Sequence, residues 1–125
     1  MSGQTILYVE DNEYNRKIVR QLFSRTSYRL IEAVDGEAGV TLAQQEKPSL
    51  ILMDVQLPKM SGLDATRALK ADARTSHIPI IVITSFALSG DREKAAEAGA
   101  ASYLAKPYSP RELLTLVRQY LPEAQ

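Results

Sequence analysis

The sequence predicts an α/β fold with a single, five-stranded parallel sheet. Beginning at Thr5, five short apolar runs alternate with five longer amphipathic segments, which is the pattern of successive βα units. The run at residues 50–53 (LILM) is the most informative, because four consecutive apolar residues are typical of a strand buried on both faces. This run ends in a carboxylate, Asp54, and open α/β sheets bind their ligands at the carboxyl ends of the strands. Asp54 is therefore expected at the functional edge of the sheet.

The amino-terminal half of the chain predicts three strands, at residues 6–9, 29–33 and 50–54. The second of them is the most polar, which places it nearer an edge of the sheet. Between the first two strands, a helix is predicted by apolar residues at helical spacing, namely Tyr14, Ile18, Leu22 and Phe23. Asp35 should cap a second helix that runs to about Lys47, where Pro48 stops it.

The carboxyl-terminal half predicts two further strands, at residues 79–84 and 101–105, and three helices. Ser61 should begin the first of these helices, which fades near Asp72, and Ser89 should cap the next. Gly99 stands where a left-handed helix cap is expected. The last helix opens on residues 109–112 (SPRE), which supply an N-cap, a first-turn proline and a capping-box glutamate.

Length and composition indicate one globular domain over residues 1–125, with its core at about residues 4–122 and no separate output domain. No apolar run approaches the ~20 residues of a membrane helix, and the polar residues 1–5 do not form a secretory signal. The absence of cysteine excludes disulfides and thiol catalysis, and it fits the cytoplasm. Fifteen basic residues balance fifteen acidic ones, so no basic face for nucleic acid is expected.

Polar and charged side chains follow four of the five predicted strands, at Glu10, Asp11, Asp54, Thr84 and Lys106. Each alone could be a turn or cap residue, but in a parallel sheet they all meet at one edge. Crowded carboxylates repel by about 1 kcal/mol per pair at 4 Å in water, and by about 4 kcal/mol at an effective dielectric of 20. Lys106 supplies one counter-charge, and Mg²⁺, which prefers oxygen ligands, would supply two more. The set suits phosphoryl transfer, in which positioning and charge neutralisation dominate catalysis.

Five separated motifs occur in order: Glu10-Asp11, Asp54 with the tail Leu57-Pro58…Met60-Ser61-Gly62, Thr84, Tyr103, and Lys106-Pro107. In these motifs the chain resembles the receiver domain of bacterial two-component response regulators. The resemblance covers essentially residues 4–122, and stand-alone receivers of the CheY and DivK type are the most similar. It implies a flavodoxin-like (βα)5 three-layer sandwich with the parallel sheet order 2-1-3-4-5.

In such a receiver, Asp54 accepts a phosphoryl group from a phosphohistidine of a sensor histidine kinase or a histidine phosphotransfer protein. The resemblance implies that Asp11, Asp54 and the main-chain carbonyl of Gln56 bind Mg²⁺ directly, with Mn²⁺ as an alternative. Glu10 would act mostly through water. Gln56 and Phe86 occupy positions that tune the lifetime of the phosphoryl group in the family, and the bulky Phe86 predicts a long-lived phosphoaspartate.

The resemblance also implies a switch. Lys106 would pair with Asp54 before the reaction and with a phosphoryl oxygen after it, and the Lys106-Pro107 bond is usually cis in the family. Thr84 would move toward the new negative charge, and Tyr103 would rotate inward. The surface formed by the fourth helix, fifth strand and fifth helix would then bind a downstream protein. Without an output domain, the domain would act by such contacts, as a monomer or as a homodimer.

Other functions are weighed against this one on the residues themselves. A flavodoxin-like electron carrier would need phosphate-binding donors after the first strand, where residues 10–13 (EDNE) instead repel a phosphate. A phosphatase with an aspartyl nucleophile would carry a second Asp where this chain has Gln56. A receiver that serves only as an unphosphorylated scaffold would not need an intact acidic site. We therefore expect a signalling module, with self-phosphorylation and self-dephosphorylation as its only reactions, and not an enzyme.

Two further features are expected to carry no chemistry. His77 is the single histidine, and its sequence neighbours offer no partner for a catalytic or metal-binding role. We expect it in a loop. The run at residues 92–94 (REK) is expected to form an ordinary solvated helix face.

Overall fold

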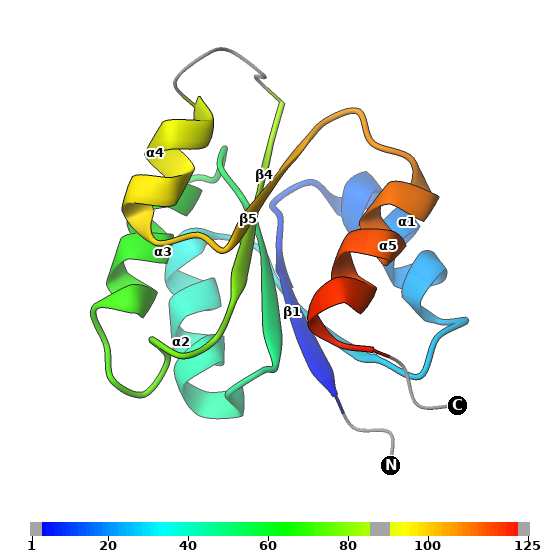
Figure 1. The fold of residues 1–125 in the computed structure, drawn as a ribbon, viewed down its shortest axis with the longest axis horizontal. Helices are drawn as coiled ribbons and strands as arrows, with labels where there is room; N and C mark the ends of the chain where they lie inside the picture. Colours follow the sequence, from blue (N-terminus) through cyan, green and yellow to red (C-terminus); the bar gives the residue numbers. More distant parts are fainter. Residues whose placement is uncertain (1–3, 86–90, 123–125) are drawn as a thin grey trace.

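The protein is described by a computed structural model that covers residues 4–85 and 91–122. Its elements alternate along the chain (Figure 1), in the order β1 (Thr5–Val9), α1 (Glu13–Phe23), β2 (Arg29–Ala33), α2 (Gly36–Glu46), β3 (Leu50–Asp54), α3 (Gly62–Lys70), β4 (Ile80–Thr84), α4 (Asp91–Ala98), β5 (Ser102–Ala105) and α5 (Pro110–Tyr120). The strands are parallel, in the sheet order β2-β1-β3-β4-β5. The predicted fold class and sheet order are confirmed, and the polar strand β2 lies at an edge.

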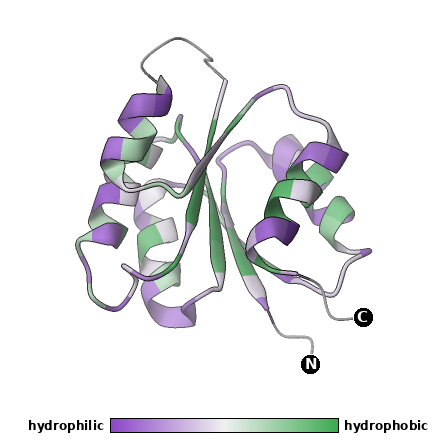
Figure 2. Cartoon of the chain, in the orientation of Figure 1, coloured by the Kyte–Doolittle hydropathy of each residue, from purple (hydrophilic) through white to green (hydrophobic). Residues whose placement is uncertain are grey.

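Helices cover both faces of the sheet, with α1 and α5 on one face and α2, α3 and α4 on the other (Figure 1). Side chains along a strand alternate between these faces. Ile6 and Tyr8 of β1 therefore belong to the apolar cluster under α1 and α5, whereas Leu7 and Val9 belong to the cluster under α2, α3 and α4. In Figure 2 the central strands are accordingly among the most hydrophobic parts of the chain. Within the described residues, no helix has the length and apolar character needed to cross a membrane.

Helix caps follow the sequence signals. Each of three predicted caps accepts a backbone N–H of its own helix: Asp35 in α2, Ser61 in α3 and Ser109 in α5. The predicted capping box is completed by Glu112, whose side chain accepts from the Ser109 backbone. Gly99 follows α4 with a φ of 104°, as expected for a left-handed cap. The predicted cap Ser89 and the predicted shielding residue Phe86 lie outside the described residues.

The register of the sheet brings the strand ends to one edge. Val9 lies opposite Met53 in the β1–β3 pair, and Asp54 lies opposite Ile83 in the β3–β4 pair. Neighbouring strands end at nearly the same level. The residues that end or follow them therefore lie close together at the carboxyl edge of the sheet. The sequence predicts that the acidic side chains lie at this edge.

Gly62 allows the segment after β3 to fold back onto the strand end. Its backbone N–H donates to the carbonyl oxygen of Val55 at 2.8 Å. A Cβ at position 62 would lie 1.9 Å from the carbonyl oxygen of Asp54, which is a backbone atom and cannot turn aside. Glycine is therefore required for this close approach, and the approach holds the main chain of Asp54 in place.

Gly62→Ala should lower the free energy of unfolding by about 1–3 kcal/mol or more, because the added methyl group forces the backbone of β3 or of the loop to move. Urea unfolding measures the loss. Gly39→Ala is the matched control: its Cβ would meet side-chain atoms of Val9, the nearest at 2.8 Å, and α2 gains about 1 kcal/mol of helix propensity. Equal losses in the two variants would contradict the backbone constraint at Gly62.

Candidate functional site

Three carboxylates meet at the carboxyl edge of the sheet. Glu10 and Asp11 follow β1 and Asp54 ends β3, and one carboxylate oxygen of each lies within 4.8 Å of the others. Glu10 and Asp54 are almost fully buried, with 2% and 3% of their surface exposed, whereas Asp11 is exposed. The structure thus brings together, as one acidic pocket, the acidic residues that the sequence assigned to the ends of separate strands.

Lys106 lies between two of these carboxylates. Its Nζ is 3.1 Å from Oε1 of Glu10 and 3.2 Å from Oδ2 of Asp54. The backbone N–H of Lys106 donates to the carbonyl oxygen of Thr84 at 2.7 Å, which extends the pairing of β4 and β5 up to this residue. The Lys106-Pro107 bond is cis, as the resemblance implied. One ammonium group therefore serves two buried carboxylates, with the third acidic group of Asp11 nearby.

This imbalance of charge perturbs the protonation of the pocket. Burial and the negative charge of Glu10 raise the pKa of Asp54 to about 6. Burial also disfavours the ionised form of Glu10, but hydrogen bonds with Asp54 and Lys106 outweigh it and lower the pKa of Glu10. Burial disfavours the ammonium of Lys106, yet the two carboxylates raise the pKa of Lys106 overall. The pocket has fewer positive than negative charges. Asp54 is the carboxyl group whose affinity for a proton increases as a result.

A divalent cation fits this donor set. Mg²⁺ and Mn²⁺ prefer carboxylate and carbonyl oxygens, and the pocket offers three carboxylates. The backbone N–H of Gln56 donates to Oδ1 of Asp54 at 3.2 Å, which puts the main chain of Gln56 beside the same carboxylate. Glu10, Asp11, Asp54 and Gln56 are the residues that would hold the ion. Its two charges would offset the acidic excess and favour the ionised form of Asp54.

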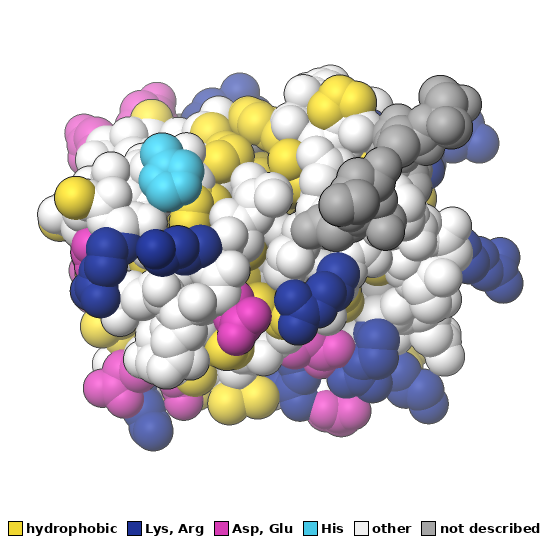
Figure 3. Space-filling model, turned by 90° about the horizontal axis from the view of Figure 1, so that it is seen from below, with side chains coloured by type: hydrophobic (Ala, Val, Ile, Leu, Met, Phe, Trp, Pro, Cys, Tyr) yellow, Lys and Arg dark blue, Asp and Glu magenta, His cyan; other side chains and the backbone are white. Residues whose placement is uncertain are grey.

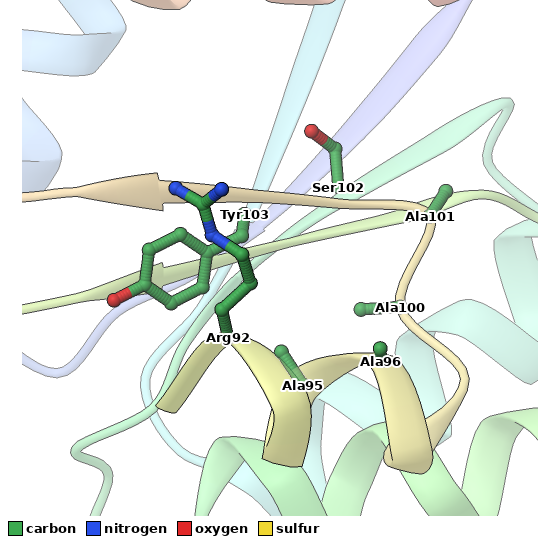
Figure 4. Close-up of a pocket in the computed structure, with 7 residues that line it drawn as sticks. All are labelled: Arg92, Ala95, Ala96, Ala100, Ala101, Ser102 and Tyr103. Atoms are coloured by element: carbon green, nitrogen blue, oxygen red, sulfur yellow. The ribbon is translucent and has the colours of Figure 1, made fainter. Parts of the chain in front are cut away.

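The two predicted switch residues lie on β4 and β5. Thr84 ends β4, is 1% exposed, and lies opposite Ala105. Tyr103 lies two residues before Ala105, and the Arg92 guanidinium carbon is 5.4 Å from the centroid of its ring, which is a cation–π contact. Figure 4 shows Arg92 reaching from α4 across this ring, beside a pocket of about 320 Å³ that is otherwise lined mainly by alanines.

Residues 92–94 are all exposed, as expected for a solvated face, and Arg92 in addition lies over the ring of Tyr103. His77 is likewise exposed, in the turn before β4, as expected. It lies at the amino-terminal end of that strand, on the side of the molecule seen in Figure 3, and so at the opposite end from the acidic pocket.

Sequence reasoning did not identify the donors that hold Glu10. The Tyr8 hydroxyl donates to Oε1 at 3.3 Å, and the side-chain amide of Asn15 donates to the same oxygen at 3.4 Å. The backbone N–H of Asn12 donates to Oε2 at 3.2 Å. Arg16 Nη1 donates to the main-chain carbonyl oxygen of Glu10 at 2.8 Å. The one available signal was an aromatic residue with a hydroxyl group inside an otherwise aliphatic strand.

The fold and the acidic pocket together define a receiver domain of a response regulator. The chain matches the response regulator receiver domain family over residues 6–118, and it belongs to that family. It is 40% identical over 121 residues to the polar-differentiation response regulator DivK of Brucella anthropi, a similarity that covers 97% of this chain and 98% of that protein. The resemblance stated on the five motifs is thus confirmed.

Solved structures of similar proteins contain the expected metals. The receiver domain of a sensor histidine kinase from Pseudomonas aeruginosa PAO1, crystallised with magnesium coordinated in its active site cleft, is 38% identical with a TM-score of 0.87, over 94% of this chain and 97% of that one. The Mn²⁺-bound response regulator Rcp1 is 28% identical with a TM-score of 0.79, over 94% and 91% of the two chains. Both metals are ones that the donor set of this pocket suits.

Lys106→Met should destabilise the metal-free domain by about 3–5 kcal/mol, because it leaves Glu10 and Asp54 buried without a counter-charge. Urea unfolding at neutral pH with a chelator measures this loss, and added Mg²⁺ should reduce it. Lys94→Met, at an exposed position of α4, is the control and should change stability by less than about 0.5 kcal/mol. A loss in Lys106→Met that Mg²⁺ leaves unchanged would contradict an electrostatic role.

The raised pKa of Asp54 makes the stability of the metal-free domain depend on pH. Because the folded-state value of about 6 lies above the ordinary 3.8, the contribution of Asp54 to stability is fully present below about pH 4 and is lost as the pH rises through 6. Asp54→Asn, which cannot ionise, should therefore be more stable than the wild type at pH 7.5, by roughly 1–3 kcal/mol. Unfolding between pH 4 and 8 measures this, with the exposed Glu97→Gln as the control. A difference that does not shrink toward pH 4 would count against it.

Proposed function

We propose that this receiver domain accepts a phosphoryl group on Asp54 from the phosphohistidine of a sensor histidine kinase or a histidine phosphotransfer protein, in a Mg²⁺-dependent reaction. The observation that carries the proposal is the pocket. Asp54 is buried at the end of a central strand, 3.2 Å from Lys106 and close to the carboxylates of Glu10 and Asp11. A nucleophilic carboxylate, a fixed ammonium group and a metal donor set are what this transfer requires.

In the transfer, an oxygen of the Asp54 carboxylate forms a bond to phosphorus while the bond from phosphorus to the histidine nitrogen breaks. The imidazole leaves with the electron pair of that bond. The cation would supply charge neutralisation for the phosphoryl oxygens. Lys106, which pairs with Asp54 Oδ2 at 3.2 Å, can donate to a phosphoryl oxygen once Asp54 carries the group. Its contact with Glu10 Oε1 at 3.1 Å keeps the ammonium in place throughout.

Thr84 and Tyr103 would carry the signal to the surface of α4, β5 and α5. A phosphoryl group adds about 1.5–2 negative charges and strong acceptor oxygens. Thr84 ends the strand next to Asp54, and its hydroxyl would donate to such an oxygen. Its movement would give the ring of Tyr103, on the adjacent strand, space to turn inward. That turn would break the contact with Arg92, and a downstream protein docked on this surface would detect the change.

The same pocket disfavours the other reactions. A flavin phosphate would meet the carboxylates of Glu10, Asp11 and Asp54 in place of neutral donors. A phosphatase of the aspartyl type would need an acid at position 56, where Gln56 places a backbone N–H on Asp54 Oδ1. The chemistry of the domain is therefore confined to its own phosphorylation and dephosphorylation.

Asp54→Asn should abolish covalent labelling by acetyl phosphate in the presence of Mg²⁺, because an amide cannot attack phosphorus. Intact-protein mass spectrometry under acidic conditions measures the phosphorylated fraction, and a chelator should abolish the label in the wild type. Asp64→Asn, which changes an exposed carboxylate of α3, should label like the wild type. Labelling of another residue in Asp54→Asn, at the wild-type rate, would refute the site.

Arg92→Ala should shift the ring of Tyr103 toward the inward position by about 2–5-fold, because it removes a cation–π contact worth about 0.5–1 kcal/mol at a partly exposed site. The population can be followed by ¹⁹F NMR of fluorotyrosine at position 103, with and without beryllofluoride as a phosphoryl mimic. Lys94→Ala removes a neighbouring exposed charge and should have no effect. An unchanged population in Arg92→Ala would show that Arg92 does not restrain the ring.

A further inference from the structure

The hydroxyl group of Tyr8 is buried beside the acidic pocket. Tyr8 is 1% exposed, and its neighbours in β1, Leu7 and Val9, are aliphatic. Its ring packs in the apolar cluster under α1 and α5, and its hydroxyl donates to Oε1 of Glu10 at 3.3 Å. A buried hydroxyl costs stability unless it is hydrogen-bonded. The two side chains therefore orient each other.

The carboxylate of Glu10 is held through both of its oxygens. Oε1 accepts from Tyr8, from Lys106 Nζ at 3.1 Å and from the side-chain amide of Asn15 at 3.4 Å. Oε2 accepts from the backbone N–H of Asn12 at 3.2 Å. Lys106 is shared with Asp54, and Asn15 is only half-buried. Tyr8 is a donor whose ring is held in the apolar core, so it limits the directions that the carboxylate can take.

A second tyrosine, Tyr108, lies near Tyr8. It packs against the apolar cluster that contains the ring of Tyr8. Tyr108 also lines a groove of about 440 Å³ beside α1, together with Ile18, Val19 and Pro107. The groove therefore lies on the same side of the sheet as the ring of Tyr8.

We propose that Tyr8 is a positioning residue of the divalent cation site, which fixes the carboxylate of Glu10 for the ion. The proposal rests on the cation site of the proposed function, and it does not require phosphoryl transfer. Side chains that orient metal ligands by a hydrogen bond typically change metal affinity by roughly 10–100-fold when they are removed. Because Glu10 is one of several acidic groups in the pocket, we expect the lower end of this range.

The test begins with Tyr8→Phe, which removes the hydroxyl and keeps the ring. Titration of the full chain with Mg²⁺, followed by amide NMR shifts, should show binding about tenfold weaker than in the wild type. Labelling by acetyl phosphate should fall at low Mg²⁺ and recover at saturating Mg²⁺. Tyr28→Phe is the matched control, because Tyr28 is also buried but donates to the main-chain carbonyl of Leu121, away from the pocket. It should reduce stability and leave the affinity for Mg²⁺ unchanged.

Wild-type affinity in Tyr8→Phe, or an equal loss in Tyr28→Phe, would overturn the positioning role. Weaker Mg²⁺ binding in Tyr8→Phe, with no labelling even of the wild type, would support this inference while refuting the proposed function.

Discussion

Two buried carboxylates share a single ammonium group. The rest of the pocket depends on this excess of negative over positive charge. Lys106 lies at nearly equal distances from Glu10 and Asp54, 3.1 Å and 3.2 Å. One positive charge cannot satisfy both, and the exposed Asp11 adds a third negative group. The excess holds the pKa of Asp54 near 6, and it also attracts a divalent cation. Cation binding and ionisation of Asp54 are therefore coupled, because each is favoured by the other.

The parallel sheet supplies the geometry for this coupling. Residues that are far apart in the chain reach one place because each ends or follows a strand, and the strands end at one level. Gly62 adds a local constraint, since the segment after β3 approaches the carbonyl of Asp54 more closely than a side chain allows. The position of Asp54 is thus set by backbone contacts and not only by its own side-chain partners.

Much of this arrangement was predictable from the sequence, and the exceptions have a common cause. The buried run that ends at Asp54 and the Ser109 capping box are local signals, and both elements lie where they were expected. The acidic residues were found because the ends of parallel strands converge. Tyr8 was missed because an aromatic residue in a buried strand is equally consistent with core packing, and the residue pattern does not show which way its hydroxyl points. The contact of Arg92 with Tyr103 was not predicted because the two residues lie on different elements.

The sheet divides the apolar interior into two separate compartments, and the aromatic residues near the pocket are distributed between them. Tyr108, with the groove beside α1, packs in the compartment under α1 and α5, whereas Tyr103 packs in the one under α2, α3 and α4. Substitutions in two regions that share no contacts have additive effects on stability. Each side can therefore accumulate changes in shape without repacking the other. A domain built in this way can change the shape of one flank while it retains the shape of the opposite flank, with the acidic pocket common to both.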